Sequence, residues 1–165
     1  MKEDEDTTRQ DVCLTSVEPT PGLPPQVWAN DVQLSITQYE WATPEGFVSH
    51  IVENPEDAVI TPVRLASRTL HLTISTSVKP SAFVITFFAD ADEHGFPLVS
   101  SGFNIDCFES DQCRITFEDS LMNVEIDQMG TFRFAVIRVA YLNGALVTTQ
   151  ENMLSTASWV MSFSK

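Results

Sequence analysis

The three cysteines are the residues whose spacing most directly permits covalent chemistry. Cys107 and Cys113 lie on either side of the segment Glu109–Gln112, which has the composition of a turn. Two residues that face each other across a short turn can lie within the distance that a disulfide requires. The spacing therefore predicts a disulfide between them, with two reduced thiols as the alternative if the protein works in a reducing compartment. Cys13 is left over, and we interpret it as an incidental free thiol.

A second candidate is the start of a calcium-binding loop. Asp90 and Asp92 stand two residues apart, and Gly95 occupies the sixth position, as in the motif D-x-D-x-D-G. The pattern then fails, because His94 takes the fifth position and Ser101 takes the twelfth, where a bidentate glutamate is required. We therefore interpret this segment as a solvated β-turn and predict no metal site.

No other combination of residues indicates catalysis. The histidines at positions 50, 71 and 94 are far apart, and none lies in an H-E-x-x-H or C-x-x-C motif that would favour zinc. The sequence contains no G-x-S-x-G motif for a nucleophilic serine. Adjacent carboxylates such as Glu118 and Asp119 point to opposite faces of a strand, so they cannot flank one scissile bond. We expect no enzymatic activity, no metal and no cofactor.

Aromatic residues form the remaining candidate site. Tyr39 and Trp41 are two residues apart, so on a strand they share a face. Exposed rings of this kind can stack on a sugar or anchor a protein partner. Tyr39 and Trp41 are therefore a possible ligand platform. The alternative is that these rings pack between two sheets, as most aromatic residues of a β-sandwich do.

The charge balance excludes one large class of partners. The chain has 165 residues, with 23 acidic side chains against 9 Lys and Arg, which gives a net charge of −14. Binding to phosphates requires clustered cations, so nucleic acid and anionic membrane surfaces are not expected partners. No apolar run approaches the roughly 20 residues that span a bilayer, so we expect no direct membrane insertion.

The elements that must position these residues are strands. Apolar and polar residues alternate with a period of two, which is typical of half-buried strands. Such stretches lie at 32–41, 70–74, 83–88, 132–142 and 158–163. No long helix is expected, since the nearest candidate, 118–129, carries the strand-forming residues Val124 and Ile126.

Turn residues predict how these strands are joined. Lys79-Pro80-Ser81 predicts that 70–74 and 83–88 form a hairpin, and the turn at 109–112 predicts a second one. Asn143-Gly144 is a strong hairpin signal at the end of the strand that starts near Phe132. Short strands separated by turns at this spacing favour an antiparallel sandwich of about seven to nine strands.

The first 26 residues differ from the rest. Glu3-Asp4-Glu5-Asp6 is a run of like charges, and prolines follow at positions 19, 21, 24 and 25. A segment of this composition cannot offset its ordering entropy by burial. We expect an acidic, Pro-rich flexible tail over 1–26 and the β-sandwich domain over 27–165. The tail is either a spacer that tethers the domain to a surface or simply a trimmed terminus.

Two groups of residues resemble known domains. The run Met129-Gly130-Thr131-Phe132-Arg133-Phe134, with Asp127 before it, resembles the entry into the penultimate strand of immunoglobulin-like domains over about ten residues. More widely, a set of motifs recurs in order in small extracytoplasmic lipoproteins of Gram-positive bacteria. The set comprises Tyr39-x-Trp41, the strand 70–74, Lys79-Pro80 and Asp92-x-x-Gly95-x-Pro97. The resemblance implies an immunoglobulin-like β-sandwich outside the membrane, with no catalytic residues to carry over.

The sequence thus favours a non-enzymatic, extracytoplasmic binding module of a bacterium, secreted or anchored at the cell surface, with an unidentified protein or glycan partner. One alternative is a carbohydrate-binding module that uses the region of Trp41. Another is a hydrolase or protease inhibitor that acts through the loops 92–97 and 143–155.

Overall fold

The computed structural model describes residues 22–43, 45–65, 67–127, 131–143 and 154–164. The described chain is all-β: it contains twelve strands and two single turns of 3-10 helix, η1 (Pro55–Asp57) and η2 (Val99–Ser101). The predicted all-β class is confirmed, but the number of strands exceeds the predicted seven to nine. The tail predicted over 1–26 lies mostly outside the described residues.

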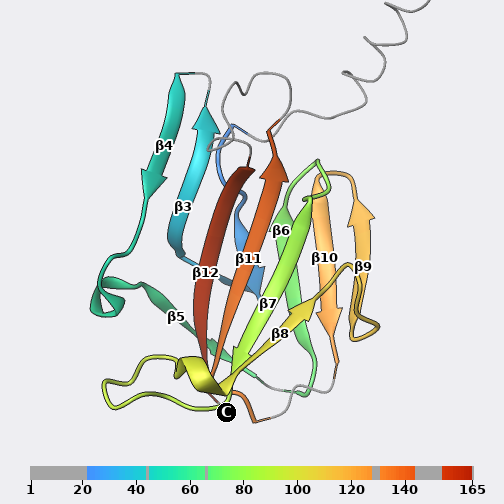
Figure 1. The fold of residues 1–165 in the computed structure, drawn as a ribbon. Helices are drawn as coiled ribbons and strands as arrows, with labels where there is room; N and C mark the ends of the chain where they lie inside the picture. Colours follow the sequence, from blue (N-terminus) through green and yellow to red (C-terminus); the bar gives the residue numbers. More distant parts are fainter. Residues whose placement is uncertain (1–21, 44, 66, 128–130, 144–153, 165) are drawn as a thin grey trace, which may run out of the picture.

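The strands form two sheets (Figure 1). The five-stranded sheet has the order β2 (Val32–Gln33), β1 (Val27–Ala29), β6 (Leu70–Ser75), β10 (Leu121–Ile126) and β9 (Cys113–Glu118). The seven-stranded sheet has the order β4 (Gly46–His50), β3 (Ile36–Thr43), β12 (Leu154–Ser164), β11 (Phe134–Leu142), β7 (Ala82–Phe88) and β8 (Gly102–Asp106). Its last member, β5 (Ile60–Arg64), pairs with β12 in parallel, whereas every other pairing is antiparallel.

One apolar core lies between the sheets, and the alternation of side chains accounts for it. In β6 the side chains of Leu70, Leu72 and Ile74 are buried, whereas His71 between them is exposed. The strands β7 and β10 show the same alternation. Because successive side chains of a strand point to opposite faces, each of these strands contributes one apolar face to the core.

The prediction of one long strand over 32–41 is wrong. The structure divides it into β2 and β3, which belong to different sheets. The alternation of Val32, Leu34 and Ile36 continues through the crossing because Leu34, which lies between the two strands, is itself buried in the core. An apolar residue at a crossover therefore produces the same pattern as one inside a strand.

The two hairpins predicted from turns are also wrong. β6 and β7 lie in different sheets, and so do β8 and β9, which means that both turns carry the chain across the sandwich. The predicted pairing before and after Asn143 is confirmed, since β11 and β12 are antiparallel neighbours from Leu142 and Leu154 onward. Gly144 lies outside the described residues.

The described residues contain no helix long and apolar enough to cross a membrane.

Candidate functional site

An open apolar pocket lies at one side of the sandwich, between the β3–β4 hairpin and the start of β1. We call it the edge pocket; its volume is about 640 Å³. It is lined by Leu23, Pro24, Pro25, Gln26, Gln33, Leu34, Ser35, Ile36, Tyr39, Trp41, Thr43, Val48 and Trp159. None of these side chains is acidic or basic, although the chain carries a net charge of −14.

The pocket exists because the two sheets differ in extent at this side. The seven-stranded sheet ends in the full-length strands β3 and β4, whereas the five-stranded sheet ends in β2, which has two residues. The inner face of the β3–β4 hairpin therefore lacks a complete cover. Val48 on this hairpin remains 44% exposed, and Leu23 at the opposite wall remains 74% exposed.

The structure places Tyr39 and Trp41 at this pocket but corrects the prediction of an exposed platform. Trp41 is fully buried, and its ring meets that of Tyr141 edge-on, with centroids 5.5 Å apart. A buried ring cannot offer its face to a sugar, so the proposed role of Trp41 in a carbohydrate-binding module is not supported by its position. Tyr39 is half-buried, and its ring centroid lies 6.0 Å from that of His50.

Sequence reasoning missed the other walls of the edge pocket. Leu23, Pro24 and Pro25 were assigned to the tail, and Val48 was assigned to no strand. A signal for the hairpin was present in Thr43-Pro44-Glu45-Gly46, because proline and glycine at this spacing favour a tight turn. Nothing local indicates that Trp159, more than one hundred residues away, would border the same space.

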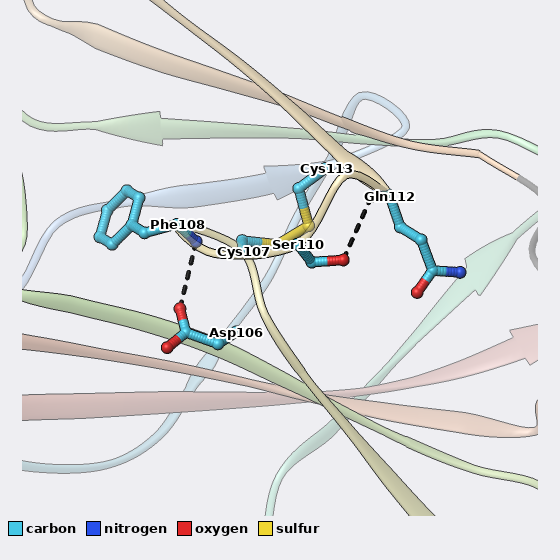
Figure 2. Close-up of a disulfide and its surroundings, with 6 residues drawn as sticks. All are labelled: Asp106, Cys107, Phe108, Ser110, Gln112 and Cys113. Carbon is cyan, nitrogen blue, oxygen red and sulfur yellow. Dashed lines mark hydrogen bonds between the residues drawn. A yellow bond between two sulfur atoms is a disulfide. The ribbon is translucent and has the colours of Figure 1, made fainter.

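The predicted disulfide is present. The sulfur atoms of Cys107 and Cys113 are 2.07 Å apart, and their Cα atoms are 5.3 Å apart. Figure 2 shows the short loop that the bond closes, with the Asp106 carboxylate accepting from the Phe108 N–H at 3.1 Å and the Ser110 hydroxyl accepting from the Gln112 N–H at 3.1 Å. The bond differs from the prediction in its place, because it joins the end of β8 to the start of β9 across two sheets.

The disulfide loop carries a second, smaller concavity. It has a volume of about 270 Å³ and lies against the start of β9. Lys79 approaches from the β6–β7 loop, and its ammonium nitrogen lies 4.7 Å from the ring centroid of Phe108. Glu109 and Asp111 line the same concavity, so its lining contains side chains of both charges.

The segment that begins like a calcium loop folds as a self-contained turn. One carboxylate oxygen of Asp92 accepts from the backbone N–H groups of His94 and Phe96, each at 2.9 Å. The hydrogen bond from the Phe96 backbone is the main cause that lowers the pKa of Asp92 from its ordinary value. This oxygen is therefore occupied by its own loop, in agreement with the interpretation as a β-turn.

The histidines stand at three separate places. His71 lies 3.4 Å from a carboxylate oxygen of Glu125 on the outer face of the five-stranded sheet, and His94 lies 3.4 Å from Glu93. On the same outer face Arg114 contacts Glu125 at 2.7 Å and Asp127 at 3.2 Å. Within the described parts of the chain, no three His, Cys, Asp or Glu side chains are grouped so that they could hold a metal ion.

Comparison with known proteins adds no relative: no protein-family model matches this chain, and neither a curated protein nor a solved structure matches it.

Proposed function

We propose that this chain is a non-enzymatic binding module that works outside the cytoplasm, secreted from or anchored to a bacterial cell, and that the edge pocket holds an uncharged, largely apolar ligand. The observation that carries the proposal is the contrast between the pocket and the rest of the chain. Among the residues that the structure describes, no acidic or basic side chain lines the pocket, although the chain has 23 acidic residues and 9 Lys and Arg.

The ligand class follows from the lining. A volume of about 640 Å³ is within the usual range for small-molecule sites. A charged group buried there would lose hydration without a side chain of opposite charge to compensate it. Tyr39, Gln33 and Ser35 supply a few hydrogen-bonding groups that can orient an otherwise apolar ligand.

An immunoglobulin-like topology forms part of the proposal, and the strand order supports it. The order β1-β6-β10-β9 corresponds to the order A-B-E-D of immunoglobulin domains, and β12-β11-β7-β8 corresponds to G-F-C followed by an additional edge strand. In this assignment the β3–β4 hairpin is an insertion beside the last strand. The insertion therefore supplies one wall of the edge pocket, whereas Trp159 on β12 belongs to the common sandwich.

The disulfide supports a site of action outside the cytoplasm. Disulfides form and persist in oxidising compartments, and thiols in the cytosol are kept reduced. The bond between Cys107 and Cys113 is consistent with secretion or cell-surface attachment. Mass spectrometry of the native protein from cell fractions tests this part: recovery of the reduced chain in the cytosolic fraction would contradict it.

Binding of a neutral fluorescent probe tests the pocket. N-phenyl-1-naphthylamine is uncharged and apolar, so we expect saturable binding with a rise in its fluorescence. Val48→Asp places a carboxylate at the mouth of the pocket and should weaken this binding about tenfold, because the charge must be kept hydrated or neutralised when the probe is bound.

The matched control is Val99→Asp, since Val99 lies in η2, is 85% exposed and does not line the pocket. We expect probe binding to be unchanged in this variant. The proposal is contradicted if the probe binds without saturation, or if both variants weaken binding equally.

A further inference from the structure

The edge strand β9 is exposed along one side. Among the described residues it pairs only with β10, so the N–H and C=O groups on its outer side form no ladder. It contains six residues and neither proline nor glycine. An edge of this kind can add another strand unless some feature prevents it. Figure 1 shows β9 at the side of the molecule opposite to β4 and hence away from the edge pocket.

The inner face of β9 is apolar but incompletely covered. Ile115 and Phe117 are register partners of Val124 and Met122, which point into the core. Phe117 nevertheless remains 50% exposed, because it stands at the rim of the sheet. A strand that extended the sheet would cover this ring.

The outer face of β9 carries one positive and one negative charge. Arg114 lies near its start and Glu118 is its last residue, and both are exposed. The described contacts of Arg114 with Glu125 and Asp127 all use one nitrogen, Nη2. A guanidinium has five N–H donors, so others remain for a further acceptor.

These residues make β9 complementary to itself. If two copies of β9 pair antiparallel about a two-fold axis at Thr116, Arg114 of each copy stands opposite Glu118 of the other. Ile115 then stands opposite Phe117, and the two Thr116 residues face each other. Opposite charges and apolar pairs directly across an antiparallel ladder are both stabilising. A two-fold contact uses the same patch on both subunits, as this arrangement does.

We propose that two copies of this chain associate through β9, so that their five-stranded sheets continue into one another. The alternative registers are less favourable. A parallel pairing places Arg114 opposite Arg114, and a shift by two residues leaves each charge opposite Thr116 or beyond the strand. A shift by one residue would place the apolar faces of the two copies, which carry Ile115 and Phe117, on opposite sides of the joined sheet.

The other edges lack this complementarity. β2 has two residues, and β4 and β8 each begin with glycine. Among the described strands, β5 pairs only with β12 and contains Pro62, which has no N–H to donate to a ladder. Antiparallel self-pairing of β8 would place Asp106 opposite Gly102, and that of β4 would place His50 opposite Gly46. The disulfide adds to the suitability of β9, since Cys113 at its start is held by Cys107 from the other sheet.

Charge reversal tests the dimer. We expect the oxidised full chain to sediment as a dimer at micromolar concentration. In a dimer of the Arg114→Glu variant, the new glutamate at position 114 of each copy stands opposite Glu118 of the other. In a dimer of the Glu118→Arg variant, the new arginine at position 118 of each copy stands opposite Arg114 of the other. Like charges that face each other across an interface oppose association, so each variant should raise the dimer dissociation constant by roughly tenfold or more. An equimolar mixture of the two variants restores every opposite-charge pair and should form a heterodimer.

Arg138→Glu on β11 and Glu40→Arg on β3 are the matched controls, because each makes the same charge change on an exposed residue of the other sheet. Both should dimerise like the unaltered chain, and circular dichroism checks that all four variants fold. A monomeric unaltered chain would overturn the proposal. So would two monomeric variants that fail to associate when mixed, or control variants that dissociate equally.

Discussion

At the scale of single residues, a buried hydroxyl pair joins the crossover between β6 and β7 to the opposite sheet. The hydroxyl of Tyr141 donates to the hydroxyl oxygen of Thr76 at 2.8 Å, and the Thr76 hydroxyl donates to the carbonyl of Val78 at 2.7 Å. Both residues are buried. The pair therefore fixes the β6–β7 loop, which also carries Lys79, against β11.

Removing this hydrogen bond should have a measurable cost. Tyr141→Phe keeps the packing of the ring against Trp41 and removes only the donor. We expect the free energy of unfolding in urea to fall by about 1 kcal/mol, the usual net contribution of one hydrogen bond. Tyr39→Phe is the control, because no hydrogen bond of the Tyr39 hydroxyl is present among the described residues. Equal losses in both variants would contradict the assignment.

The same residue predicts a response to alkaline pH. Burial raises the pKa of Tyr141 above its ordinary value. Its native form then retains a proton that the unfolded chain loses near pH 10, so stability is fully present below that pH and decreases as the pH rises. We expect the urea midpoint to fall between about pH 9 and about pH 11, with Cys13 alkylated. The fall should be smaller in Tyr141→Phe. If the urea midpoint decreases equally with pH in both proteins, another group is responsible.

At the scale of elements, the disulfide is the covalent link between the two sheets on the β8–β9 side. Its loop is short, so the chain-entropy estimate gives a stabilisation on the order of 2 kcal/mol. Reduction, or Cys107→Ser combined with Cys113→Ser, should lower the free energy of unfolding by this amount. Unfolded, unreduced protein should show one Ellman-reactive thiol, that of Cys13. Three reactive thiols in that sample would contradict the bond.

The loop between β7 and β8 should not respond to calcium. The carboxylate oxygen of Asp92 that faces the loop is already bonded to two backbone N–H groups. We expect the same melting temperature in millimolar calcium chloride and in sodium chloride of equal ionic strength. A rise that is specific to calcium would overturn this view of the segment 90–95.

At the scale of the whole molecule, the excess of acidic side chains should oppose folding. With 23 acidic residues and 9 Lys and Arg, carboxylates repel one another at neutral pH. Salt shortens the Debye length from roughly 30 Å at about 10 mM to a few Å at about 500 mM. We expect the melting temperature to rise over this range of NaCl. A flat or falling response would show that ion pairs such as Arg114–Glu125 outweigh the repulsion.

Moderate acidification should also raise the melting temperature, and further acidification should lower it. Protonation of repelling carboxylates first reduces the net charge and raises the melting temperature. Asp92 has a lowered pKa in the folded state. Its contribution to the stability of the fold is therefore fully present above the pKa of an unfolded Asp, near pH 4, and is lost as the pH falls through the folded pKa. Thermal melts over a series of pH values at constant ionic strength measure both the rise and the later fall of the melting temperature. A melting temperature that falls steadily from neutral pH would contradict the predicted rise.

The sequence by itself determined which side chains face inward along β6 and β7 and which cysteines could bond. Leu70, Leu72 and Ile74 are buried where alternation predicts, and Cys107 bonds Cys113. These features depend on neighbours a few residues apart, so local spacing is sufficient to predict them.

Only the tertiary structure decided which sheet each strand joins. A turn such as Lys79-Pro80-Ser81 reverses or redirects the chain equally well within a sheet or across the sandwich, so two crossovers were predicted as hairpins. The edge pocket depends on the same choice, because β2 is too short to cover the hairpin that carries Val48. Strand partners are selected by burial summed over residues far apart in the chain, and a local pattern does not contain that information.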